Sequence, residues 1–582
     1  MRELLTGNEA IARGAYEAGC LVAAAYPGTP STEILENLAN YREIDAQWSP
    51  NEKVAVEIAG GAAIGGVRAL AAMKHVGLNV AADPLMTLAY SGIKGGLVIV
   101  TADDPGAHSS QNEQDNRHYA SLAKVIMLEP SDSQECKDFT KMAFALSEQF
   151  DLPVLIRVTT RICHSKSLVE LGKREVVKPG EYKKDVKKYV MVPAHARLKH
   201  YSLEAVLQNI RNWGNYSSLN KIVKGKKRWG IITAGIAYQY AREVFGEEAT
   251  YLKLGLTHPL PEKLLREFAK EVEEVIVIEE NDPYLETRVK ALGIKCQGKN
   301  RLPLCGELTP DIIRGAFFSE QKQAKEVNLN IPTRPPVLCA GCPHRGLFYA
   351  LKKFKEVVVA GDIGCYTLGF MPPLEITDTV ICMGASISGG IGLKKALPTK
   401  KVFSCLGDST FFHSGITGLI DVVYNQTDLK IVILDNRTTA MTGHQDNPGT
   451  GKTLQGESVP SLNIVELVKA VGVKKIRVID PYDLTATEKA LQEAYQAQEP
   501  FVIISKRPCA LLKEVRRERR GWACSVDPEK CTNCRACLRL GCPALVAEEK
   551  QVVIDSEQCN GCGLCAQVCR FGAISRVGEK ND

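Results

Sequence analysis

Apolar runs alternate with stretches of helical periodicity along most of this 582-residue chain. This alternation is typical of α/β folds, in which helices cover both faces of a parallel sheet. The most apolar short runs are predicted to be buried strands, and they cover residues 97–101, 154–158, 274–280, 401–406 and 430–434. The pattern therefore predicts several parallel sheets built from strand–helix–strand units.

Changes in composition divide the chain into five predicted parts. A Lys-rich stretch follows the first part, a Pro-rich joint opens the fourth, and a run of charged residues precedes the last. The charged run, residues 513–520, is interpreted as a solvated tether. The boundaries are 1–170, 171–225 (a linker or surface excursion), 226–325, 330–510 and 521–582.

Eight of the 20 cysteines crowd into residues 531–569, in two runs of the form C-x2-C-x2-C with a more distant fourth cysteine. In proteins with two [4Fe–4S] clusters, each triplet wraps around one cluster and the fourth thiolate reaches the other. The spacing therefore predicts a first cluster on Cys531, Cys534, Cys537 and Cys569, and a second on Cys559, Cys562, Cys565 and Cys542.

This cysteine pattern departs from the usual one in two places. Four residues separate Cys537 from Cys542, and Arg570 stands where a proline usually follows the last cysteine. Structural zinc sites are the alternative, because they also use pairs of cysteines spaced by two residues. Two complete triplets favour iron–sulfur clusters, so the chain is expected to handle single electrons.

The composition is that of an ordinary globular enzyme. Hydrophobic residues make up 45% and charged residues 24%, and the net charge is +6. No basic strip interleaved with aromatic residues suggests a nucleic-acid partner. Polar residues interrupt every apolar run before it could span a membrane, and the other cysteines show no disulfide framework. We therefore expect a cytoplasmic enzyme with neither a nucleic-acid nor a membrane partner.

Two predicted strands end in oxygen-bearing side chains. Residues 401–406 lead into Gly407-Asp408-Ser409, and residues 430–434 lead into Asp435-Asn436. Ligands of α/β folds bind at the carboxyl ends of the strands, and carboxylate and amide oxygens suit Mg²⁺ that is completed by phosphates. The spacing resembles the thiamine diphosphate motif, with Ser409 in place of its last glycine. That resemblance implies a cofactor site at Gly407, Asp408, Ser409 and Asn436, with Mg²⁺ bound by Asp408, Asn436 and the Thr438 carbonyl.

A run of small residues upstream is a second candidate contact for the cofactor. It begins at Met383, Gly384 and Ala385 and opens a predicted helix. Small side chains let phosphate oxygens approach the backbone N–H groups of a helix N-terminus. Tight helix packing is the alternative explanation for these residues.

Thiamine enzymes also need a carboxylate from a separate domain, which hydrogen-bonds the aminopyrimidine ring of the cofactor. Glu52 is the predicted catalytic acid, because Gly61 follows it by the nine residues that separate acid and glycine in those enzymes. Such an acid works best when it is partly buried. Glu57, on the same predicted helix, is the alternative.

Three segments of the chain resemble one family, the 2-oxoacid:ferredoxin oxidoreductases. They are Tyr26-Pro27-Gly28-Thr29-Pro30-Ser31, residues 103–115 and Cys339-Ala340-Gly341-Cys342-Pro343-His344-Arg345. The order of parts is also similar to that family. The resemblance covers essentially the whole chain and implies a pyrimidine domain at 1–170, a transketolase C-terminal-like domain at 226–325, a diphosphate domain at 330–510 and a two-cluster ferredoxin domain at 521–582.

The resemblance implies an activity, cofactors and partners. The expected reaction is oxidative decarboxylation of an arylpyruvate such as indolepyruvate with coenzyme A, giving an aryl-acetyl-CoA, CO2 and reduced ferredoxin. The expected cofactors are thiamine diphosphate, Mg²⁺ and two [4Fe–4S] clusters. Because the small gamma-type domain of the family is absent from these residues, a smaller beta subunit is expected to complete an α2β2 assembly. Candidate substrate contacts are Thr29, His75 and His344, each of which has a structural role as its alternative.

Several alternatives stay open at the level of the sequence. The substrate could be pyruvate or 2-oxoglutarate, because no residue reveals the size of the substrate's side chain. A non-oxidative thiamine decarboxylase and a non-catalytic electron-transfer subunit are rival functions. Cys339 and Cys342 could bind zinc, although a short loop near the thiamine site is the preferred interpretation.

Overall fold

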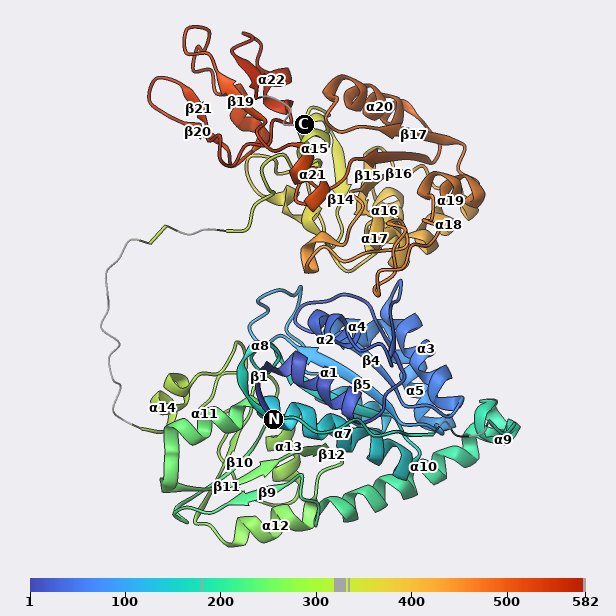
Figure 1. Cartoon of the computed structure of the whole chain (residues 1–582), viewed down its shortest axis with the longest axis vertical. Helices are drawn as coiled ribbons and strands as arrows, with labels where there is room; N and C mark the ends of the chain where they lie inside the picture. The colour runs from blue at the N-terminus through green and yellow to red at the C-terminus, as the bar shows by residue number, and fades with distance from the viewer. Residues whose placement is uncertain (179, 181, 319–330, 333–334, 579–582) are drawn as a thin grey trace. The chain divides into compact units, whose positions relative to one another are not determined.

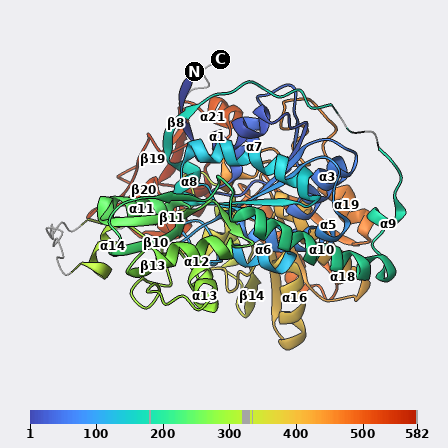
Figure 2. The same cartoon turned by 90° about the horizontal axis from the view of Figure 1, so that it is seen from below.

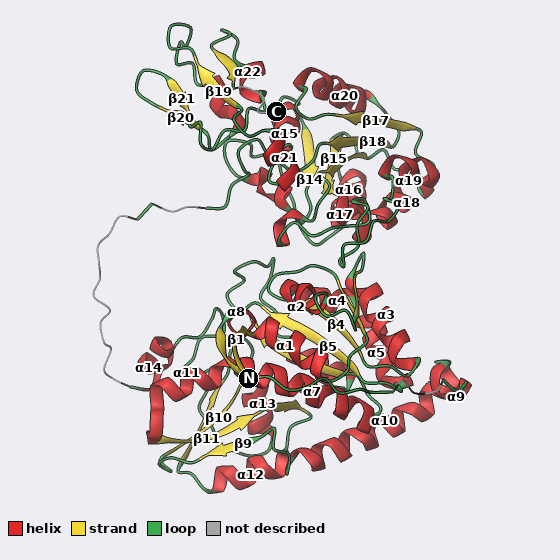
Figure 3. Cartoon of the chain, viewed as in Figure 1, coloured by secondary structure: helices red, strands yellow, loops and turns green. Residues whose placement is uncertain are grey.

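The computed structural model describes residues 1–178, 180, 182–318, 331–332 and 335–578. The chain forms two compact units, Met1–Asn328 and Leu329–Asp582 (Figure 1). In each unit helices flank sheets made largely of parallel strands (Figure 3). The predicted α/β class is thereby confirmed, whereas the division into five parts stays a prediction.

The first unit contains a seven-stranded sheet. Its order is β12 (Leu256–His258), β6 (Ile126–Leu128), β7 (Val154–Thr159), β5 (Leu97–Asp103), β4 (Ala69–Lys74), β2 (Val22–Ala25) and β3 (Asp45–Trp48). All neighbours pair in parallel except β12, which is antiparallel to β6. Every residue of β5 is buried, as expected for a strand covered on both faces. The runs predicted at 97–101 and 154–158 are confirmed as β5 and β7.

Two further sheets complete the strands of this unit. A four-stranded sheet has the order β13 (Glu274–Ile278), β10 (Trp229–Ala234), β11 (Ala249–Leu254) and β9 (Lys221–Val223), with only β9 antiparallel. A two-stranded antiparallel ribbon pairs β1 (Arg2–Thr6) with β8 (Lys166–Glu170). The strand predicted at 274–280 is confirmed as β13. Since β12 follows β11 in the chain, a segment of the third predicted part completes the sheet of the first part.

The helices of the first unit cover these sheets. They are α1 (Gly7–Glu17), α2 (Thr32–Leu38), α3 (Glu52–Ile64), α4 (His75–Val80), α5 (Ala82–Ser91), α6 (Arg117–Ala123), α7 (Ser133–Phe150), α8 (Thr160–His164), α9 (Val186–Tyr189), α10 (Pro193–Gly214), α11 (Ile236–Phe245), α12 (Glu262–Lys270), α13 (Tyr284–Ala291) and α14 (Pro310–Phe317). Several begin at a side-chain cap. Thr6 and Glu9 form a capping box on α1, and Asn51 caps α3.

Residues 171–225 are more than the predicted linker. They contain the 22-residue helix α10, which lies beside α5 (Figure 2), and the sheet strand β9. Leu203, Leu207 and Ile210 are buried on one side of α10. Their spacing of three and four residues makes an apolar stripe that a helix can bury. The Lys-rich composition of the preceding stretch concealed this amphipathic pattern.

The second unit is built on a five-stranded parallel sheet. Its order is β14 (Val357–Ala360), β15 (Lys401–Gly407), β16 (Lys430–Asp435), β18 (Phe501–Lys506) and β17 (Lys475–Ile479). The predicted strands at 401–406 and 430–434 are confirmed as β15 and β16. Alternate residues of β15 face opposite cores, with Phe403 and Cys405 in one and Val402 and Leu406 in the other.

Helices cover both faces of this sheet. One core receives α15 (His344–Leu351) and α20 (Leu484–Gln496), and the other receives α16 (Ala385–Ala396), α18 (Ile416–Tyr424) and α19 (Ile464–Val471). The short helix α17 (Asp408–Thr410) follows β15 directly, and α21 (Lys513–Glu518) follows the sheet. The carboxyl ends of β15 and β16 are therefore held between two packed layers.

The cysteine-rich end of the chain packs within the second unit. It has two antiparallel ribbons, β19 (Ala523–Val526) with β22 (Ile574–Val577) and β20 (Leu545–Ala547) with β21 (Val552–Ile554), and the helix α22 (Leu564–Val568). Its core includes Tyr482 and Leu484, which lie just after β17. Across the part of the chain that the structure describes, no helix combines the length and apolar character needed to cross a membrane.

Candidate active site

The three predicted Mg²⁺ ligands converge at the carboxyl ends of β15 and β16. Asp408, Asn436 and Thr438 are all buried. When the side-chain nitrogen of Asn436 faces Asp408 and Thr438, it lies 3.1 Å from Asp408 Oδ1 and 2.9 Å from the Thr438 carbonyl oxygen. A half-turn of that amide would bring its oxygen to face the same two oxygens. The structure therefore brings together a carboxylate, an amide and a backbone carbonyl.

The spacing of these atoms fits a small hard cation. Mg²⁺ binds oxygen at about 2.0–2.1 Å in octahedral geometry, which puts neighbouring ligands about 2.9 Å apart. The separations of 3.1 and 2.9 Å around Asn436 match that value. Three oxygen ligands from the chain would leave other positions of the octahedron for phosphate oxygens and water.

The electrostatic environment of Asp408 also favours a cation. Its Oδ1 accepts a hydrogen bond from the Ser409 N–H (2.8 Å), and its Oδ2 accepts one from the Asn447 side-chain amide (3.2 Å). Burial and the nearby Asp435 raise the pKa of Asp408 to about 7. A bound divalent cation would offset both the burial and the repulsion between the two carboxylates.

The small residues predicted to bind phosphate are arranged differently from the expectation. The buried carboxylate of Asp362 accepts hydrogen bonds from the N–H groups of Gly384 (3.0 Å) and Ser386 (2.9 Å) at the start of α16. The Ala385 N–H donates to the Cys382 carbonyl oxygen. The first N–H groups of α16 are thus already used within the chain, because Asp362 caps the helix. A role for residues 383–385 in cofactor binding stays a prediction. The N–H groups at the start of α16 that already have partners within the chain do not support it.

Gly407 and Ser409, the other predicted cofactor residues, are tightly packed. A Cβ atom on Gly407 would lie 2.7 Å from a ring carbon of Tyr366, so only glycine fits there without movement of that ring. Tyr366 in turn hydrogen-bonds the Thr410 hydroxyl (2.8 Å). Ser409 is buried and accepts a hydrogen bond from the Thr439 hydroxyl (3.0 Å). The serine that replaces the usual glycine therefore leaves the geometry of Asp408 intact.

His344, a predicted substrate contact, lies in the same unit. It is buried at the start of α15, with its ring centre 6.0 Å from that of Tyr366. Burial, together with Arg345, lowers the pKa of His344 to about 4. A neutral His344 beside Tyr366 is compatible with packing against an aromatic ring of a bound ligand. The contact of His344 with substrate stays a prediction.

The structure brings together the two predicted sets of cluster cysteines. Burial raises the pKa of the Cys537 thiol, and the nearby thiols of Cys534, Cys569 and Cys531 raise that pKa further. Cys542 lines one cavity with Cys559, Cys562 and Cys565. Backbone N–H groups also point at the sulfurs, from Cys524 and Gly561 to Cys559 and from Ala573 to Cys569. Each predicted set thus has its fourth cysteine near its triplet, and the assignment of the eight cysteines to two clusters stays a prediction.

A third group of thiols escaped the sequence analysis. Burial raises the pKa of Cys342 and of Cys365; the thiols of Cys365 and Cys509 add to the shift of Cys342, and those of Cys509 and Cys339 add to the shift of Cys365. Burial also raises the pKa of Cys509, with Cys339 and Asp408 adding to it, and the Cys509 N–H donates to the Asn436 carbonyl oxygen (2.9 Å), so this group adjoins the candidate Mg²⁺ site. One short interval and two long, unequal ones separate the four cysteines, and only the short spacing of Cys339 and Cys342 was visible as a signal.

The third group also adjoins the second cluster set. Ala340 and Gly341 line the same cavity as Cys542 and Cys559. The guanidinium of Arg345 donates to the carbonyl oxygens of Cys339 (3.0 Å) and Leu540 (3.1 Å), which ties the two segments together. The oxygen ligands, the group of four thiols and the second cluster set are therefore neighbours within the second unit.

The predicted acid lies in the first unit. Glu52 is the first residue of α3, just beyond the carboxyl end of β3, and only 5% of it is exposed. A Cβ atom on Gly77 would lie 2.7 Å from Glu52 Oε1, so the carboxyl group packs directly against α4. Glu57, the alternative, has a side chain 45% exposed and forms an ion pair with Lys53. Of the two carboxylates, Glu52 has the buried position that the predicted chemistry needs.

Other predicted substrate residues share the edge with Glu52. Thr29 follows β2, and His75 follows β4 and is fully buried. His75 Nε2 lies 2.9 Å from Asn112 Oδ1, whereas its Nδ1 has no hydrogen-bond partner among the described residues. The carboxyl ends of β2, β3 and β4 therefore collect Thr29, Glu52 and His75 along one edge of the sheet.

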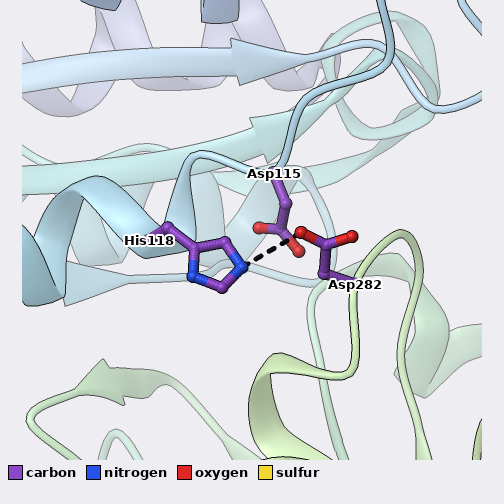
Figure 4. A group of neighbouring side chains, drawn as sticks. All are labelled: Asp115, His118 and Asp282. Atoms are coloured by element: carbon purple, nitrogen blue, oxygen red, sulfur yellow. Dashed lines mark hydrogen bonds and ion pairs between the residues drawn. The ribbon is translucent and has the colours of Figure 1, made fainter.

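Asp115, His118 and Asp282 form a group that could also suggest a metal site (Figure 4). Asp115 is already bound by the Arg117 guanidinium at 2.5 Å, and His118 Nε2 lies 3.0 Å from Asp282 Oδ2. Arg117 also pairs with Glu279 across to the four-stranded sheet at 2.6 Å. These contacts identify the group as part of an ion-pair network that joins the two sheets of the first unit.

Comparison with protein families gives three matches. Residues 13–216 match the family described as pyruvate flavodoxin/ferredoxin oxidoreductase, thiamine diphosphate-binding. Residues 362–505 match the C-terminal thiamine pyrophosphate-binding domain of thiamine pyrophosphate enzymes. Residues 552–575 match a 4Fe–4S binding domain. The second match contains Asp408 and Asn436, and the third contains Cys559, Cys562, Cys565 and Cys569.

Curated relatives align over nearly the whole chain. Indolepyruvate oxidoreductase subunit IorA of Methanothermobacter thermautotrophicus is 43% identical, over 99% of this chain and 97% of the relative. The protein of the same name from Archaeoglobus fulgidus is 42% identical over 98% and 97%. The one from Pyrococcus horikoshii is 41% identical over 99% and 97%. This chain belongs to the IorA family.

Membership of the IorA family confirms the resemblance seen in the sequence. Together with the matched domains, it makes the chain part of a thiamine diphosphate-dependent 2-oxoacid:ferredoxin oxidoreductase. Thiamine diphosphate and iron–sulfur clusters are confirmed as its cofactors. The relatives are each named as a subunit, which indicates a partner subunit.

Proposed function

We propose that this member of the IorA family oxidises an arylpyruvate, specifically indolepyruvate, with coenzyme A to an aryl-acetyl-CoA, CO2 and reduced ferredoxin. The name shared by the relatives supports the choice of substrate. The observation that carries the proposal is the arrangement of the second unit. There the Mg²⁺-type ligand set around Asp408 adjoins the group of four thiols, which in turn adjoins the second cluster set.

The residues of the chain take distinct roles in this proposal. Asp408, Asn436 and the Thr438 carbonyl hold Mg²⁺ against the diphosphate of the cofactor. When bound, thiamine diphosphate supplies the electron sink that allows a 2-oxoacid to lose CO2. Glu52 hydrogen-bonds the aminopyrimidine ring and holds the proton exchanged there, and its burial keeps competing water away.

The electrons then leave through the cysteine groups. The two sets of four cysteines in residues 531–569 hold two [4Fe–4S] clusters, and backbone N–H groups directed at their sulfurs tune the reduction potentials. The proximity of Cys339, Cys342, Cys365 and Cys509 supports a further cluster between Asp408 and the second set. This third position replaces the zinc alternative considered for Cys339 and Cys342.

The iron content of the anaerobically purified protein tests the number of clusters. Three sets of four thiolates predict about twelve iron atoms per chain, and two sets predict about eight. Cys509→Ser should remove about four iron atoms, whereas Cys305→Ser, at an exposed cysteine of the first unit, should remove none. A wild-type value near eight that Cys509→Ser leaves unchanged would exclude the third cluster. Zinc in place of iron would contradict the whole electron-transfer role.

An activity assay tests the substrate. Under anaerobic conditions with coenzyme A, indolepyruvate should reduce ferredoxin or a viologen dye faster than pyruvate or 2-oxoglutarate does. Preference for either smaller acid would correct the substrate and keep the reaction type. Release of an aldehyde without reduction of the dye would instead indicate a non-oxidative decarboxylase.

The proposal includes a smaller beta subunit in an α2β2 assembly, with ferredoxin as the electron acceptor. The subunit designation of the relatives supports a partner. Co-expression should yield a complex that contains a chain without the cysteine runs and without an equivalent of Asp408. The large chain expressed alone should bind its cofactors yet turn over slowly. Full ferredoxin-linked activity from this chain alone would contradict the need for a partner.

A further inference from the structure

Lys74, the last residue of β4, has an ammonium group with unused hydrogen-bonding capacity. Its Nζ donates one hydrogen bond, 2.9 Å long, to the Ser109 carbonyl oxygen. Among the described residues, it makes no ion pair with a carboxylate. Because an ammonium group carries three donors, two of them remain for another partner.

The position of this ammonium group is defined by three segments at one edge of the sheet. The Lys74 side chain crosses Gly28, where an added Cβ atom would lie 3.2 Å from both Lys74 Cγ and Cδ. Glu52 and Asp104 both interact with it electrostatically. Lys74 is thus surrounded by the Gly28–Thr29 turn, the predicted acid Glu52 and the segment that runs from Asp104 to Ser109.

The other cations described near this edge already have acidic or polar partners. Arg157 binds Asp103 at 2.7 Å and Glu129 at 2.6 Å, and Arg161 binds Glu307 at 2.7 Å. His164 pairs with Glu33, His108 pairs with Glu307 and His75 faces Asn112. Lys74 differs from these arginines because its described hydrogen bond goes to a neutral carbonyl oxygen rather than to a carboxylate, and it interacts with Glu52.

We propose that the Lys74 ammonium binds the carboxylate of the 2-oxoacid substrate. This inference rests on the proposed function, in which Glu52 marks the reacting end of the cofactor. A half-buried ammonium group without a directly hydrogen-bonded anion is costly, and a substrate carboxylate would supply two acceptor oxygens of opposite charge. Burial lowers the pKa of Lys74, and the carboxylates of Asp104 and Glu52 oppose that shift.

A pair of unreactive inhibitors separates this role from a structural one. Indole-3-propionate carries the carboxylate but no 2-oxo group, and indole-3-propionamide is its neutral counterpart of nearly equal size. Both are measured as competitors of indolepyruvate in the assembled enzyme, with Lys74→Met, Lys74→Arg and the control Lys53→Met. Lys53 lies on α3 near Glu52, but its ammonium is paired with Glu57.

In wild-type enzyme the carboxylate should bind more tightly than the amide. Lys74→Met should weaken the carboxylate, and raise KM for indolepyruvate, by about 10- to 100-fold, as expected for a hydrogen bond between charged groups. Affinity for the amide, thiamine diphosphate content and iron content should stay unchanged. Lys74→Arg should recover part of the preference for the carboxylate, and Lys53→Met should retain all of it.

Two results would overturn the inference. One is a preference for the carboxylate that survives in Lys74→Met, and the other is an equal loss of both inhibitors, which would show that Lys74 only holds the Ser109 segment. In either case wild-type reduction of ferredoxin by indolepyruvate would leave the proposed function standing. If wild-type enzyme oxidised no 2-oxoacid, the proposed function itself would fail.

Discussion

The carboxyl edges of the two large parallel sheets use buried charges in opposite ways. In the first unit Asp103, at the end of β5, binds Arg157 at 2.7 Å, and the same guanidinium binds Glu129 at 2.6 Å. In the second unit Asp408, at the end of β15, forms no ion pair with a described cation and accepts hydrogen bonds from the neutral Ser409 N–H and Asn447 amide groups. The carboxylate of Asp103 is therefore neutralised within the chain, whereas that of Asp408 has no paired cation among the described residues.

This difference teaches how to distinguish a structural carboxylate from a binding one in similar folds. A buried carboxylate paired within the chain mainly fixes packing, because the charge is already balanced. A buried carboxylate surrounded by carbonyl and amide oxygens is stable only when it is protonated or bound to a cation. Glu52, Lys74 and Asp104 are exceptions at the edge of the first unit, since none of the three belongs to the described ion-pair network around Arg157. Asp104 accepts hydrogen bonds from neutral groups of Ser109, Ser110 and Thr160.

The largest expected effect tests the exception at Glu52. Glu52→Gln removes the exchangeable proton and keeps the shape of the side chain, so turnover should fall by about 10²–10⁴-fold, the usual contribution of a general acid or base. Binding of thiamine diphosphate should persist, because in the proposed site Asp408 and Asn436 hold its other end. Turnover and cofactor binding, measured side by side, check both statements.

Glu57→Gln is the matched control for that experiment. Glu57 lies on the same helix, is exposed and pairs with Lys53, so its loss should change turnover by less than about twofold. If Glu57→Gln abolished turnover and Glu52→Gln did not, the assignment of the acid would be reversed.

The second-largest expected effect concerns the carboxyl edge of the sheet in the second unit. Asp408→Asn replaces the charged ligand by a neutral one of equal size and should weaken binding of thiamine diphosphate with Mg²⁺ by about 10²–10³-fold, as for other buried charge interactions. Titration of the cofactor into the apoprotein at several Mg²⁺ concentrations measures this directly. Iron content should stay at the wild-type value. Unchanged cofactor affinity would show that the convergence of oxygens at β15 and β16 is not a cation site.

A smaller effect should follow from moving Glu52 without changing it. In Gly77→Ala the new methyl group would lie 2.7 Å from Glu52 Oε1, so the carboxyl group must shift. We expect turnover to fall by about tenfold, because a misplaced catalytic group loses much of its effect even when the fold is kept. Gly315→Ala on α14 is the control, since nothing lies within 4 Å of its added Cβ atom. Equal turnover in both variants would mean that the position of Glu52 is unimportant.

Local patterns in the sequence revealed the parts of the site that lie at strand ends or in short repeats. Asp408 and Asn436 follow apolar runs, and the eight cysteines of residues 531–569 repeat at short intervals. Cys365 and Cys509 were missed because they approach Cys342 only through the fold. The use of β12 in the first sheet was missed for the same reason, since a pairing between distant segments leaves no local period.

Two further features could not be predicted from the local sequence. The start of α16 has the small residues of a phosphate site, yet the Asp362 carboxylate takes its N–H groups. No spacing in the sequence links Asp362 to Gly384 and Ser386. Polar residues of 171–185 likewise concealed the amphipathic helix α10, which becomes clear only when its buried leucines are seen against α5.

The smallest expected effect concerns the residue that departs from the thiamine motif. Ser409→Gly restores the usual glycine but removes the hydrogen bond from the Thr439 hydroxyl (3.0 Å) and frees the backbone after β15. Cofactor affinity should change by less than about threefold, because Asp408, Asn436 and Thr438 keep their positions. The apparent Tm should fall by about 2–4 °C, the shift expected for a loss near 1 kcal/mol in a domain of this size. Ser409→Ala, which removes only the hydroxyl group, should account for part of that shift. A large loss of cofactor affinity in Ser409→Gly alone would mean that the serine holds Asp408 in place. The position of the ligands in the second unit would then depend on packing around them, as the position of Asp103 in the first unit depends on its ion pair.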